Sequence, residues 1–432
     1  MTGDTGGKRL HRNVWAASVA SFLTDVSSEM VTNLIPLFLY GTLGVKANII
    51  GLIEGVAGTT ASVIKVGSGV VSDRLQSRKW LAVAGYALST LAKPFFYLAS
   101  TWGAIASVRW VERVGKGIRT APRDALVADS VQSHQRGFAF GLHRAADTAG
   151  AVLGLLIAWL VLTRVDPGVS SPDRATFQLV VLLSLIPAVL AVVVLAVGSR
   201  DIPSTREPSS RPSFRGLGRP FLGFLAIVAL FDLGNSSDAF VILRASERGL
   251  DAGGVLLMLA TFNVVYAVTS TPAGAVSDRL GRKNVLLIGW IVYAVIYAGL
   301  GFAETAWQVW ALYAAYGLYH GLTVGTGKAL VADLVPASRR ASAYGAHAAT
   351  LGLIDLPASL IAGVLWHGVG DWTGFGPSAP FLFGSATALL AAVALALYGR
   401  RLQPLRSNRV KETPQSPKTG VPRLANRMKT GS

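Results

Sequence analysis

The chain is 432 residues long, 51% of its residues are hydrophobic and only 15% are charged. Soluble domains carry about 25% charged residues, so this composition excludes an ordinary soluble protein and is typical of a chain that crosses a membrane many times. A net charge of +17 would indicate nucleic acid as the partner of a soluble chain. In a membrane protein it reflects basic cytoplasmic loops and tails, and we expect no nucleic-acid partner. The absence of cysteine excludes disulfides and cysteine-ligated metal.

Roughly twelve segments are apolar over the about 20 residues that a membrane-spanning helix needs, which predicts an all-α polytopic protein. In the first half they lie near 14–41, 47–71, 79–100, 102–128, 137–163 and 176–198. In the second half they lie near 219–243, 252–277, 284–303, 306–332, 341–368 and 376–399. The first segment is too long for the apolar region of a signal peptide and contains Asp25 and Glu29, so we expect it to remain as a span.

Basic residues mark one side of this expected layout. They cluster at Lys8, Arg9 and Arg12, at Arg74, Arg78 and Lys79, at Arg279, Arg282 and Lys283, at Arg339 and Arg340, in the linker and in the tail. Lysine and arginine favour the cytoplasmic side, so we expect both termini there. The expected organisation is a cytoplasmic N-terminus (1–13), an N-terminal bundle (14–198), a cytoplasmic linker (199–218), a C-terminal bundle (219–399) and a disordered basic tail (400–432).

The two halves of the chain repeat each other at an offset of 204 or 205 residues. The sequence VSDRL from Val71 recurs from Val276, ALVADSV from Ala125 recurs as ALVADLV from Ala329, and His143 is matched by His347. Such a repeat is what a transporter with two pseudo-symmetric six-helix bundles needs, because its site lies between the bundles and alternates between the two membrane faces.

The loops between the second and third spans of each half resemble the signature of the major facilitator superfamily, roughly G-x-x-x-D-R-x-G-R-R-K. The second-half copy, GAVSDRLGRK from Gly274, is close, and the first-half copy, GVVSDRLQSRK from Gly69, has Gln76 in place of the glycine. The resemblance covers about residues 14 to 399 and implies alternating access without nucleotide hydrolysis. It also implies that the loops make cytoplasmic contacts that hold the outward-open state, through Asp73, Arg74, Arg78, Asp278, Arg279, Gly281 and Arg282.

The fourth expected span carries five cations on one face. Positions 109, 113, 116, 119 and 123 fall within about 120° of one another on a helix, namely Arg109, Arg113, Lys116, Arg119 and Arg123. Such a stripe is too costly to face lipid, so we expect it to face a central cavity with acidic partners. The candidates are Asp25, Glu29, Glu54, Glu112, Asp124 and Asp147. Asp25 and Glu29 share a helix face, and we expect them opposite Arg113 and Lys116.

The family resemblance adds roles for some of these residues. Relatives often show R-x-x-x-G-x-G on this span, so Arg109 matches the position linked to proton coupling in drug–proton antiporters. Arg113 replaces a glycine of that pattern, which makes the cavity more cationic and argues against a lipophilic-cation substrate. Gly141, Gly150 and Gly154 keep the glycine spacing of the antiporter motif on the fifth span, although Leu155 stands where the motif has proline. The alternative for these glycines is close helix packing.

Further candidates lie on other spans. His143, Arg144 and Asp147 are close together on the fifth span, where a histidine with a carboxylate four residues later suits a proton relay. Lys65 is a candidate substrate ligand. The second half has fewer charges, at Asp232, Asp238, Arg244, Lys328 and Asp355. We expect its bundle to supply shape and apolar contact. The excess of cations in the first half favours an anionic or zwitterionic substrate.

The sequence therefore predicts a secondary active transporter rather than an enzyme, with no metal and no cofactor other than a coupling proton. The first interpretation is proton-coupled antiport that exports a small solute. The alternatives are proton-coupled uptake of an organic anion and, more remotely, a membrane sensor that does not transport. The acidic pair Asp25 and Glu29 suits either direction of transport, because a buried carboxylate can load and release a proton. We expect a monomer, multi-pass in the cytoplasmic (inner) membrane.

Overall fold

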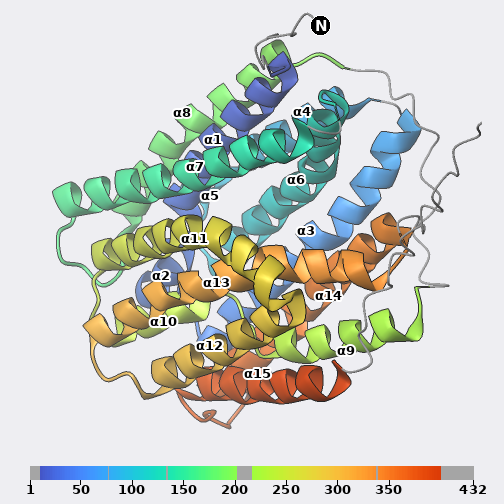
Figure 1. Ribbon diagram of the computed structural model, residues 1–432. Coiled ribbons are helices and arrows are strands. Elements are labelled where there is room, and N and C mark those ends of the chain that lie inside the picture. Colours follow the sequence, from blue (N-terminus) through green and yellow to red (C-terminus); the bar gives the residue numbers. More distant parts are fainter. Residues whose placement is uncertain (1–9, 76, 133–134, 202–216, 337–338, 400–432) are drawn as a thin grey trace, which may run out of the picture.

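The computed structural model describes residues 10–75, 77–132, 135–201, 217–336 and 339–399, and these residues are mostly helical (Figure 1). The expected basic tail and most of the expected linker lie outside the described residues. The first half contains α1 (Arg12–Thr32), α2 (Ile35–Leu37), η1 (Phe38–Thr42), α3 (Ala47–Leu75), α4 (Arg78–Ala92), α5 (Pro94–Leu98), α6 (Trp102–Asp129), α7 (Arg136–Val165) and α8 (Arg174–Gly198). The second half contains α9 (Arg219–Leu233), α10 (Ala239–Glu247), α11 (Ala252–Leu280), α12 (Arg282–Phe302), α13 (Ala306–Leu334), α14 (Arg340–His367) and α15 (Ala379–Tyr398).

Eight stretches of the described chain are long and apolar enough to cross a membrane. They are α3, α4 with α5, α7, α8, α11, α12, α14 and α15. The other expected spans coincide with α1 to η1, α6, α9 with α10, and α13. Each of these carries charge, polar residues or a helix break that lowers its apolar character. The structure is thus a multi-span helical protein, and the count of twelve spans stays a prediction.

Side chains of the loops fix where several helices begin. The Asp173 carboxylate accepts the Thr176 N–H at 2.7 Å at the start of α8, and Asp251 accepts the Gly254 N–H at 2.8 Å at the start of α11. Both are N-caps, which satisfy backbone donors that the helix itself leaves unpaired.

Three of the expected spans are interrupted by short breaks, after Thr32 in the first, at Lys93 in the third and after Leu233 in the seventh. The seventh expected span ends as α9 at Leu233 and resumes as α10 at Ala239, with the sequence GNSSD between them. The polar groups of this break are satisfied by neighbours: the Tyr293 hydroxyl donates to the Gly234 carbonyl at 3.1 Å, and the Tyr316 hydroxyl donates to Asn235 at 3.1 Å. Backbone of this kind is tolerated at membrane depth only where protein or a cavity covers it.

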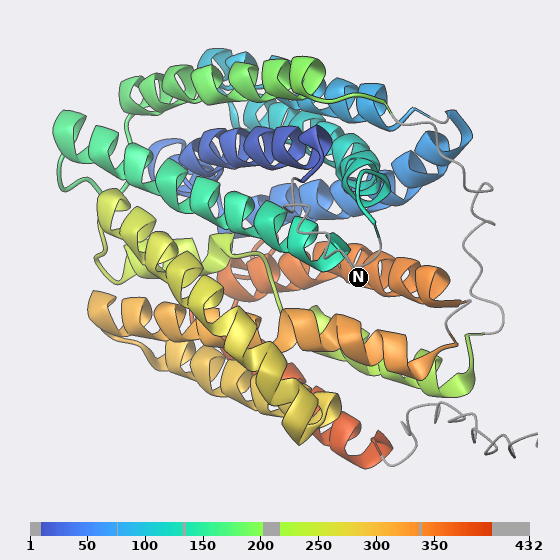
Figure 2. The ribbon, with the colours of Figure 1, turned by 45° about the horizontal axis from the view of Figure 1, so that its top comes forward.

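The helices of the two halves form two bundles that lie side by side. In Figure 2 the N-terminal half, coloured blue to green, lies on one side and the C-terminal half, coloured yellow-green to red, on the other. The halves meet mainly through α3 with α14 and α7 with α11. The first contact is very close, because a Cβ on Gly55 would come within 2.9 Å of the Leu356 Cα, and Thr59 donates to the Gly352 carbonyl at 2.7 Å.

These contacts gather at one end of the molecule. Asn48, at the start of α3, donates to the Gly368 carbonyl at 2.8 Å, and the Ala252 N–H donates to the Val169 carbonyl at 2.8 Å. Toward the other end, where the basic loops lie, Gly345 shares the α14 face of Gly352 but has only open space within 4 Å of an added Cβ. The bundles are therefore closed at one end and separated at the end of the basic loops.

The two signature loops bind within their own halves. The Arg78 guanidinium pairs with Asp73 and lies 3.5 Å from Asp129. In the second half, Arg282 lies 2.5 Å from Asp333 and 4.0 Å from Asp278. Asp129 and Asp333 are the aspartates of the two ALVAD sequences. The arginine of each signature loop therefore contacts the ALVAD aspartate of its own half. Arg74 and Arg279 are exposed, and Gly281 adopts a φ of 85° just before α12.

The glycines of α7 separate into packed and open positions. A Cβ on Gly150 would collide with the Phe22 carbonyl of α1, and a Cβ on Gly154 would collide with the Val26 carbonyl, whereas Gly141 has nothing within 4 Å. Close packing through small residues thus explains Gly150 and Gly154.

We expect valine at position 150 or 154 to destabilise the protein by about 1–3 kcal/mol, the usual cost of overpacking. Gly141→Val is the matched control and should leave stability unchanged or slightly higher, since valine is the better helix former. The thermal unfolding midpoint of the purified variants tests this. Equal losses at positions 141 and 154 would contradict the packing role.

Candidate functional site

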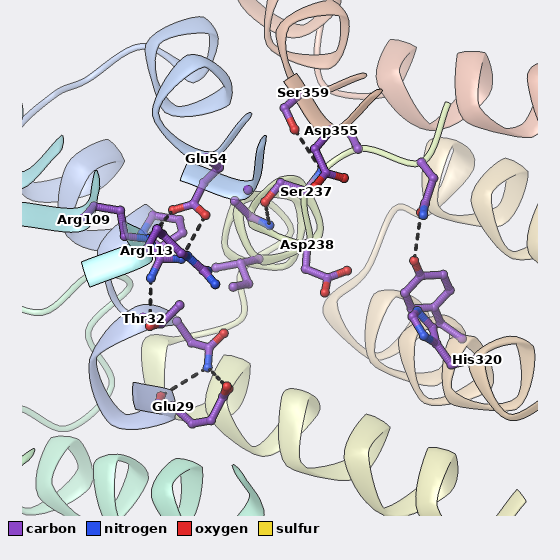
Figure 3. Close-up of a pocket in the computed structure, with 18 residues that line it drawn as sticks. Glu29, Thr32, Glu54, Arg109, Arg113, Ser237, Asp238, His320, Asp355 and Ser359 are labelled. Atoms are coloured by element: carbon purple, nitrogen blue, oxygen red, sulfur yellow. Dashed lines mark hydrogen bonds and ion pairs between the residues drawn. The ribbon is translucent and has the colours of Figure 1, made fainter. Parts of the chain in front are cut away.

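A cavity of about 360 Å³ lies between the two halves (Figure 3). This volume is in the range of small-molecule sites, about 300–1,000 Å³. Its lining combines four carboxylates and two guanidiniums with amide, hydroxyl, imidazole and phenol groups. The charged members are Glu29, Glu54, Arg109 and Arg113 from the first half and Asp238 and Asp355 from the second.

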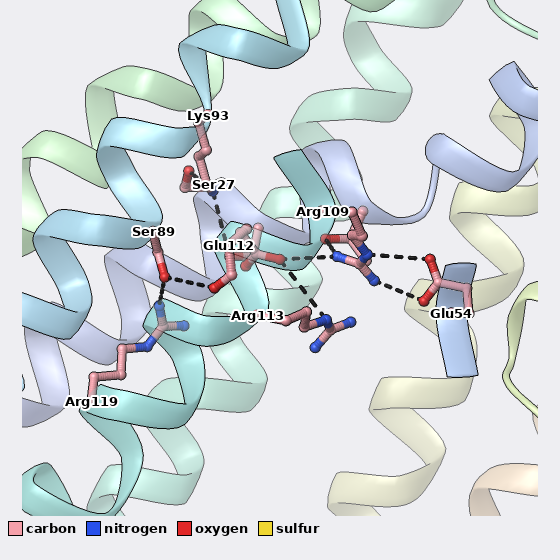
Figure 4. A network of polar contacts seen from close by, with 10 residues as sticks. Ser27, Glu54, Ser89, Lys93, Arg109, Glu112, Arg113 and Arg119 are labelled. Atoms are coloured by element: carbon pink, nitrogen blue, oxygen red, sulfur yellow. Dashed lines mark hydrogen bonds and ion pairs between the residues drawn. The ribbon is translucent and has the colours of Figure 1, made fainter. Parts of the chain in front are cut away.

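Arg109 is the centre of a polar network (Figure 4). Its side chain is 2% exposed, and it donates to both carboxylate oxygens of Glu54, Nε to Oε1 at 3.2 Å and Nη2 to Oε2 at 3.0 Å. Nη1 donates to Glu112 at 3.2 Å and to Thr32 at 3.0 Å. Four of the five guanidinium N–H groups are thus used, so Arg109 ties α1, α3 and α6 together and has little capacity left for a ligand.

Arg113, unlike Arg109, has hydrogen-bond donors that are available to a ligand. It lies one turn further along α6, its side chain is 19% exposed, and its nearest acidic oxygen, Glu112 Oε2, is 3.9 Å from Nε. Among the described residues its guanidinium has no hydrogen-bond partner, and the Nε is buried. A buried donor without a partner carries an uncompensated desolvation penalty, so a ligand that accepts its hydrogen bond would bind favourably.

Behind this network, polar side chains connect α6 to α4 and α1. The Ser89 hydroxyl donates to the Glu112 carbonyl at 3.0 Å and accepts a hydrogen bond from Arg119 at 3.0 Å. Lys93, which is 3% exposed, donates to the Ser27 hydroxyl. The Ser89 contacts thus join α6 to α4, and the Lys93 contact joins the end of α4 to α1.

Three carboxylates of the lining lack a cationic partner. Glu29 accepts a hydrogen bond from the Asn33 amide at 2.7 Å. Within the ranges that the structure describes, no lysine, arginine or histidine nitrogen lies within 4 Å of Glu29, Asp238 or Asp355. Asp238 ends the break between α9 and α10, and Asp355 lies on α14 beside Gly58 of α3.

The second-half wall of the cavity is aromatic. Tyr316 and His320 of α13 line it. The His320 ring stands edge-on to Tyr316, with centroids 4.7 Å apart, and to Phe262 at 5.2 Å. The His320 Nε2 is buried and has no hydrogen-bond partner among the described residues.

The remaining predicted residues of α6 and α7 lie outside the lining of this cavity. Arg123 donates to Asp124 at 2.8 Å, and the His143 Nε2 is 3.7 Å from Asp147. Arg144 donates to the Tyr266 hydroxyl and stacks over its ring at 5.2 Å, which is a contact between the two halves. Further residues outside the lining are Asp25, Lys65, Lys116 and Arg119.

The acids expected opposite the α6 cations lie near them without forming ion pairs. Asp25 interacts electrostatically with Lys116, and Glu29 with Arg113, but neither pair is within 4 Å in the described chain. Glu54 and Glu112 are the acids bound to Arg109. The second half also contributes more than shape, because Asp238 and Asp355 line the cavity. Arg244, in contrast, is structural, since it donates to the Leu300, Gly301 and Ala303 carbonyls at the end of α12.

Sequence reasoning missed several lining residues, among them Asn235, Tyr316 and His320. A signal for Asn235 and its neighbours was present. The polar run GNSSD interrupts an otherwise apolar span, and interrupted spans point to binding sites in transporters.

Comparisons with known proteins agree with this architecture. The family model of the Major Facilitator Superfamily matches residues 17–231 and 222–428. An uncharacterized MFS-type transporter of Methanocaldococcus jannaschii is 34% identical over 395 residues, which are 90% of this chain and 95% of that protein. An uncharacterized protein of Mycobacterium tuberculosis is 26% identical over 359 residues, 82% of this chain and 87% of that protein.

Among solved structures, the nucleoside transporter NupG superposes with a TM-score of 0.71 at 14% identity, covering 90% of this chain and 99% of that one. At that identity the likeness concerns the fold alone. Together with the family match and the internal repeat, these findings show that the chain belongs to the major facilitator superfamily and is a multi-pass membrane secondary transporter of a small molecule, not an enzyme.

Proposed function

We propose that this transporter is a proton-coupled antiporter that exports a small solute bearing a positive charge. The observation that carries the proposal is the set of cavity carboxylates without a cationic partner, Glu29, Asp238 and Asp355. A carboxylate in a water-poor site is stable when it binds a proton or pairs with a cation. These acids therefore suit two exchangeable occupants, a proton and a positively charged group of the substrate.

Competition for one carboxylate is sufficient for antiport. A substrate cation that binds Asp238 or Asp355 displaces the proton, and a proton that arrives from the other face displaces the substrate. The two affinities are linked and reduce each other equally. When the cavity alternates between faces, an inward proton gradient then drives the solute outward.

The alternative, uptake of an organic anion, has less support from the cavity. Its lining has four carboxylates against two guanidiniums, and one of these, Arg109, is already bound to Glu54 and Glu112. A purely anionic solute would meet more repulsion than attraction.

The number of spans, the orientation in the membrane and the oligomeric state are part of the same proposal. We place roughly twelve spans in two pseudo-symmetric bundles, in the cytoplasmic membrane, with both termini inside and the protein acting as a monomer. The basic loops support this orientation, and with it the state described above is inward-open.

An untargeted comparison of small molecules inside cells and in their medium tests the proposal. The strains overproduce the intact protein, the Asp238→Asn/Asp355→Asn variant or, as control, Asp371→Asn, which changes an exposed loop residue. We expect solutes that leave the cell with the intact protein and the control but not with the double variant. Collapse of the proton gradient by a protonophore should stop this export. Export that survives the protonophore would contradict coupling, and solutes gained from the medium would reverse the direction.

A further inference from the structure

We infer that the cavity selects a zwitterionic solute with an aromatic or similarly broad apolar group. In this arrangement Arg113 binds the acidic group, Asp238 and Asp355 bind the ammonium group, and Tyr316 and His320 contact the apolar part. The inference rests on the proposed function, because it names the class of solute for the same cavity.

The anchor for the acidic group is Arg113 rather than Arg109. Arg109 already donates four hydrogen bonds to Thr32, Glu54 and Glu112. Arg113 makes no hydrogen bond to a described residue and lies 3.9 Å from its nearest acid. A guanidinium binds a carboxylate or phosphate through two parallel N–H donors, so an acidic group is the partner that its free face fits.

The anchor for the ammonium group comes from the other half. Asp238 ends the helix break of the seventh expected span and Asp355 lies on α14, and both line the cavity. Figure 3 shows them on the side of the cavity opposite Glu54 and Arg109. Neither has a cation within 4 Å in the part of the chain that the structure describes, so a bound ammonium would supply the missing charge.

Placement of the two anchors on different halves has a mechanistic consequence. Arg113 belongs to the N-terminal bundle, whereas Asp238 and Asp355 belong to the C-terminal bundle. A solute with both charges bridges the bundles, and a solute with one charge binds only one of them. Differential binding to the bridged state is what shifts a conformational equilibrium, so the zwitterion is also the solute that favours the change of access.

The apolar part of the solute has a prepared surface. Tyr316 and His320 face the cavity, and Phe262 and Tyr319 pack against the His320 ring at 5.2 and 5.0 Å. Offset and edge-on aromatic contacts are favourable, and an ammonium beside such rings gains a further cation–π attraction. The His320 Nε2 is buried, and within the described ranges it has no hydrogen-bond partner.

Two matched series of probes test the charge requirement by isothermal titration calorimetry on the purified full chain at pH 7. The first is phenylalanine, phenethylamine and 3-phenylpropionate, which carry both charges, the ammonium alone and the carboxylate alone. The second is glycyl-phenylalanine, its C-terminal amide and its N-acetyl form, in which the charges lie farther apart. We expect the zwitterion of at least one series to bind about tenfold or more tightly than its two partners, the effect of a charged hydrogen bond.

Variants assign the two anchors. Arg113→Gln should remove the preference for the zwitterion over the amine or amide. Asp238→Asn, or Asp355→Asn if the first variant cannot be purified, should remove the preference over the carboxylate. Arg164→Gln and Asp371→Asn change exposed residues outside the lining and should leave all affinities unchanged.

Two outcomes overturn the inference. The first is equal binding of the zwitterion and the singly charged cation in both series, and the second is no binding by any of the six probes. Equal binding would leave the proposed antiport intact as exchange of a proton for a simple cation, because this assay uses no proton gradient. The antiport proposal itself fails only in the export measurement described above.

Discussion

Replacement of Arg109 by glutamine is expected to abolish transport and to destabilise the protein strongly. Arg109 is 2% exposed and is shared by Glu54 and Glu112, whose side chains are 9% and 5% exposed. Removal of one member of a buried ionic network typically costs about 3–5 kcal/mol, because the remaining charges lose their partner. Here two carboxylates are left unpaired on α3 and α6. Loss of this network also removes the ion pair that joins α3 to α6, and α3 is one of the helices through which the two halves meet.

Separate measurements distinguish stability from mechanism. The thermal midpoint of purified Arg109→Gln should fall well below that of the exposed control Arg164→Gln. The neutral triple variant Glu54→Gln/Arg109→Gln/Glu112→Gln removes all three charges and should recover most of the lost stability. Transport by the triple variant should remain absent, since neutral amides no longer hold α1, α3 and α6 together through charged hydrogen bonds at the wall of the cavity. A fully active Arg109→Gln, or a triple variant that transports, would show that this network serves packing alone.

Arg109→Lys gives an intermediate test of the same geometry. Lysine keeps the charge but lacks the planar fork that donates to Glu54 through two atoms at 3.2 and 3.0 Å. We therefore expect folded protein with transport reduced but not absent.

Features that depend on local pattern were predictable from the sequence. The repeat of ALVAD and of the signature loop predicted two similar halves, but it did not name the acids that hold the loop arginines, Asp129 for Arg78 and Asp333 for Arg282. The helical stripe of α6 predicted that its five cations face a cavity, since such a stripe cannot face lipid. Arg109 and Arg113 line the cavity, whereas Lys116, Arg119 and Arg123 are not in its lining.

Features that depend on which helices meet were not predictable in this way. Glu29 is one turn from Asn33, and its carboxylate bonds that amide rather than a cation of α6. Asp355 reaches the cavity because glycines let α3 and α14 approach closely, with a Cβ on Gly58 only 3.0 Å from the carboxylate. His320 lies on a helix without other cavity charges, and only its aromatic neighbours place its ring. The contact of Gly58 with Asp355 joins segments about 300 residues apart, which is beyond the reach of periodicity.

A disulfide between α7 and α11 is expected to stop transport completely and reversibly. At the closed end of the molecule, a Cβ on Gly253 would lie 3.4 Å from the Thr163 methyl carbon, so Thr163→Cys/Gly253→Cys brings two thiols into bonding range. The chain has no cysteine of its own, so no other thiol competes. Alternating access requires these helix ends to separate when the cavity opens to the other face. The oxidised variant is therefore held in one state.

The control for this experiment lies at the same end of the molecule but within one bundle. The Thr42 and Ser171 hydroxyls are 3.4 Å apart, both in the first half, so Thr42→Cys/Ser171→Cys places a disulfide where no separation is needed. We expect the oxidised control to transport at the rate of its reduced form, and the oxidised Thr163→Cys/Gly253→Cys variant to recover only after reduction with dithiothreitol. Mass spectrometry of the intact protein verifies both disulfides. Transport that continues through a verified α7–α11 disulfide would mean that these ends stay together, and that the bundles rock about this contact instead of opening it.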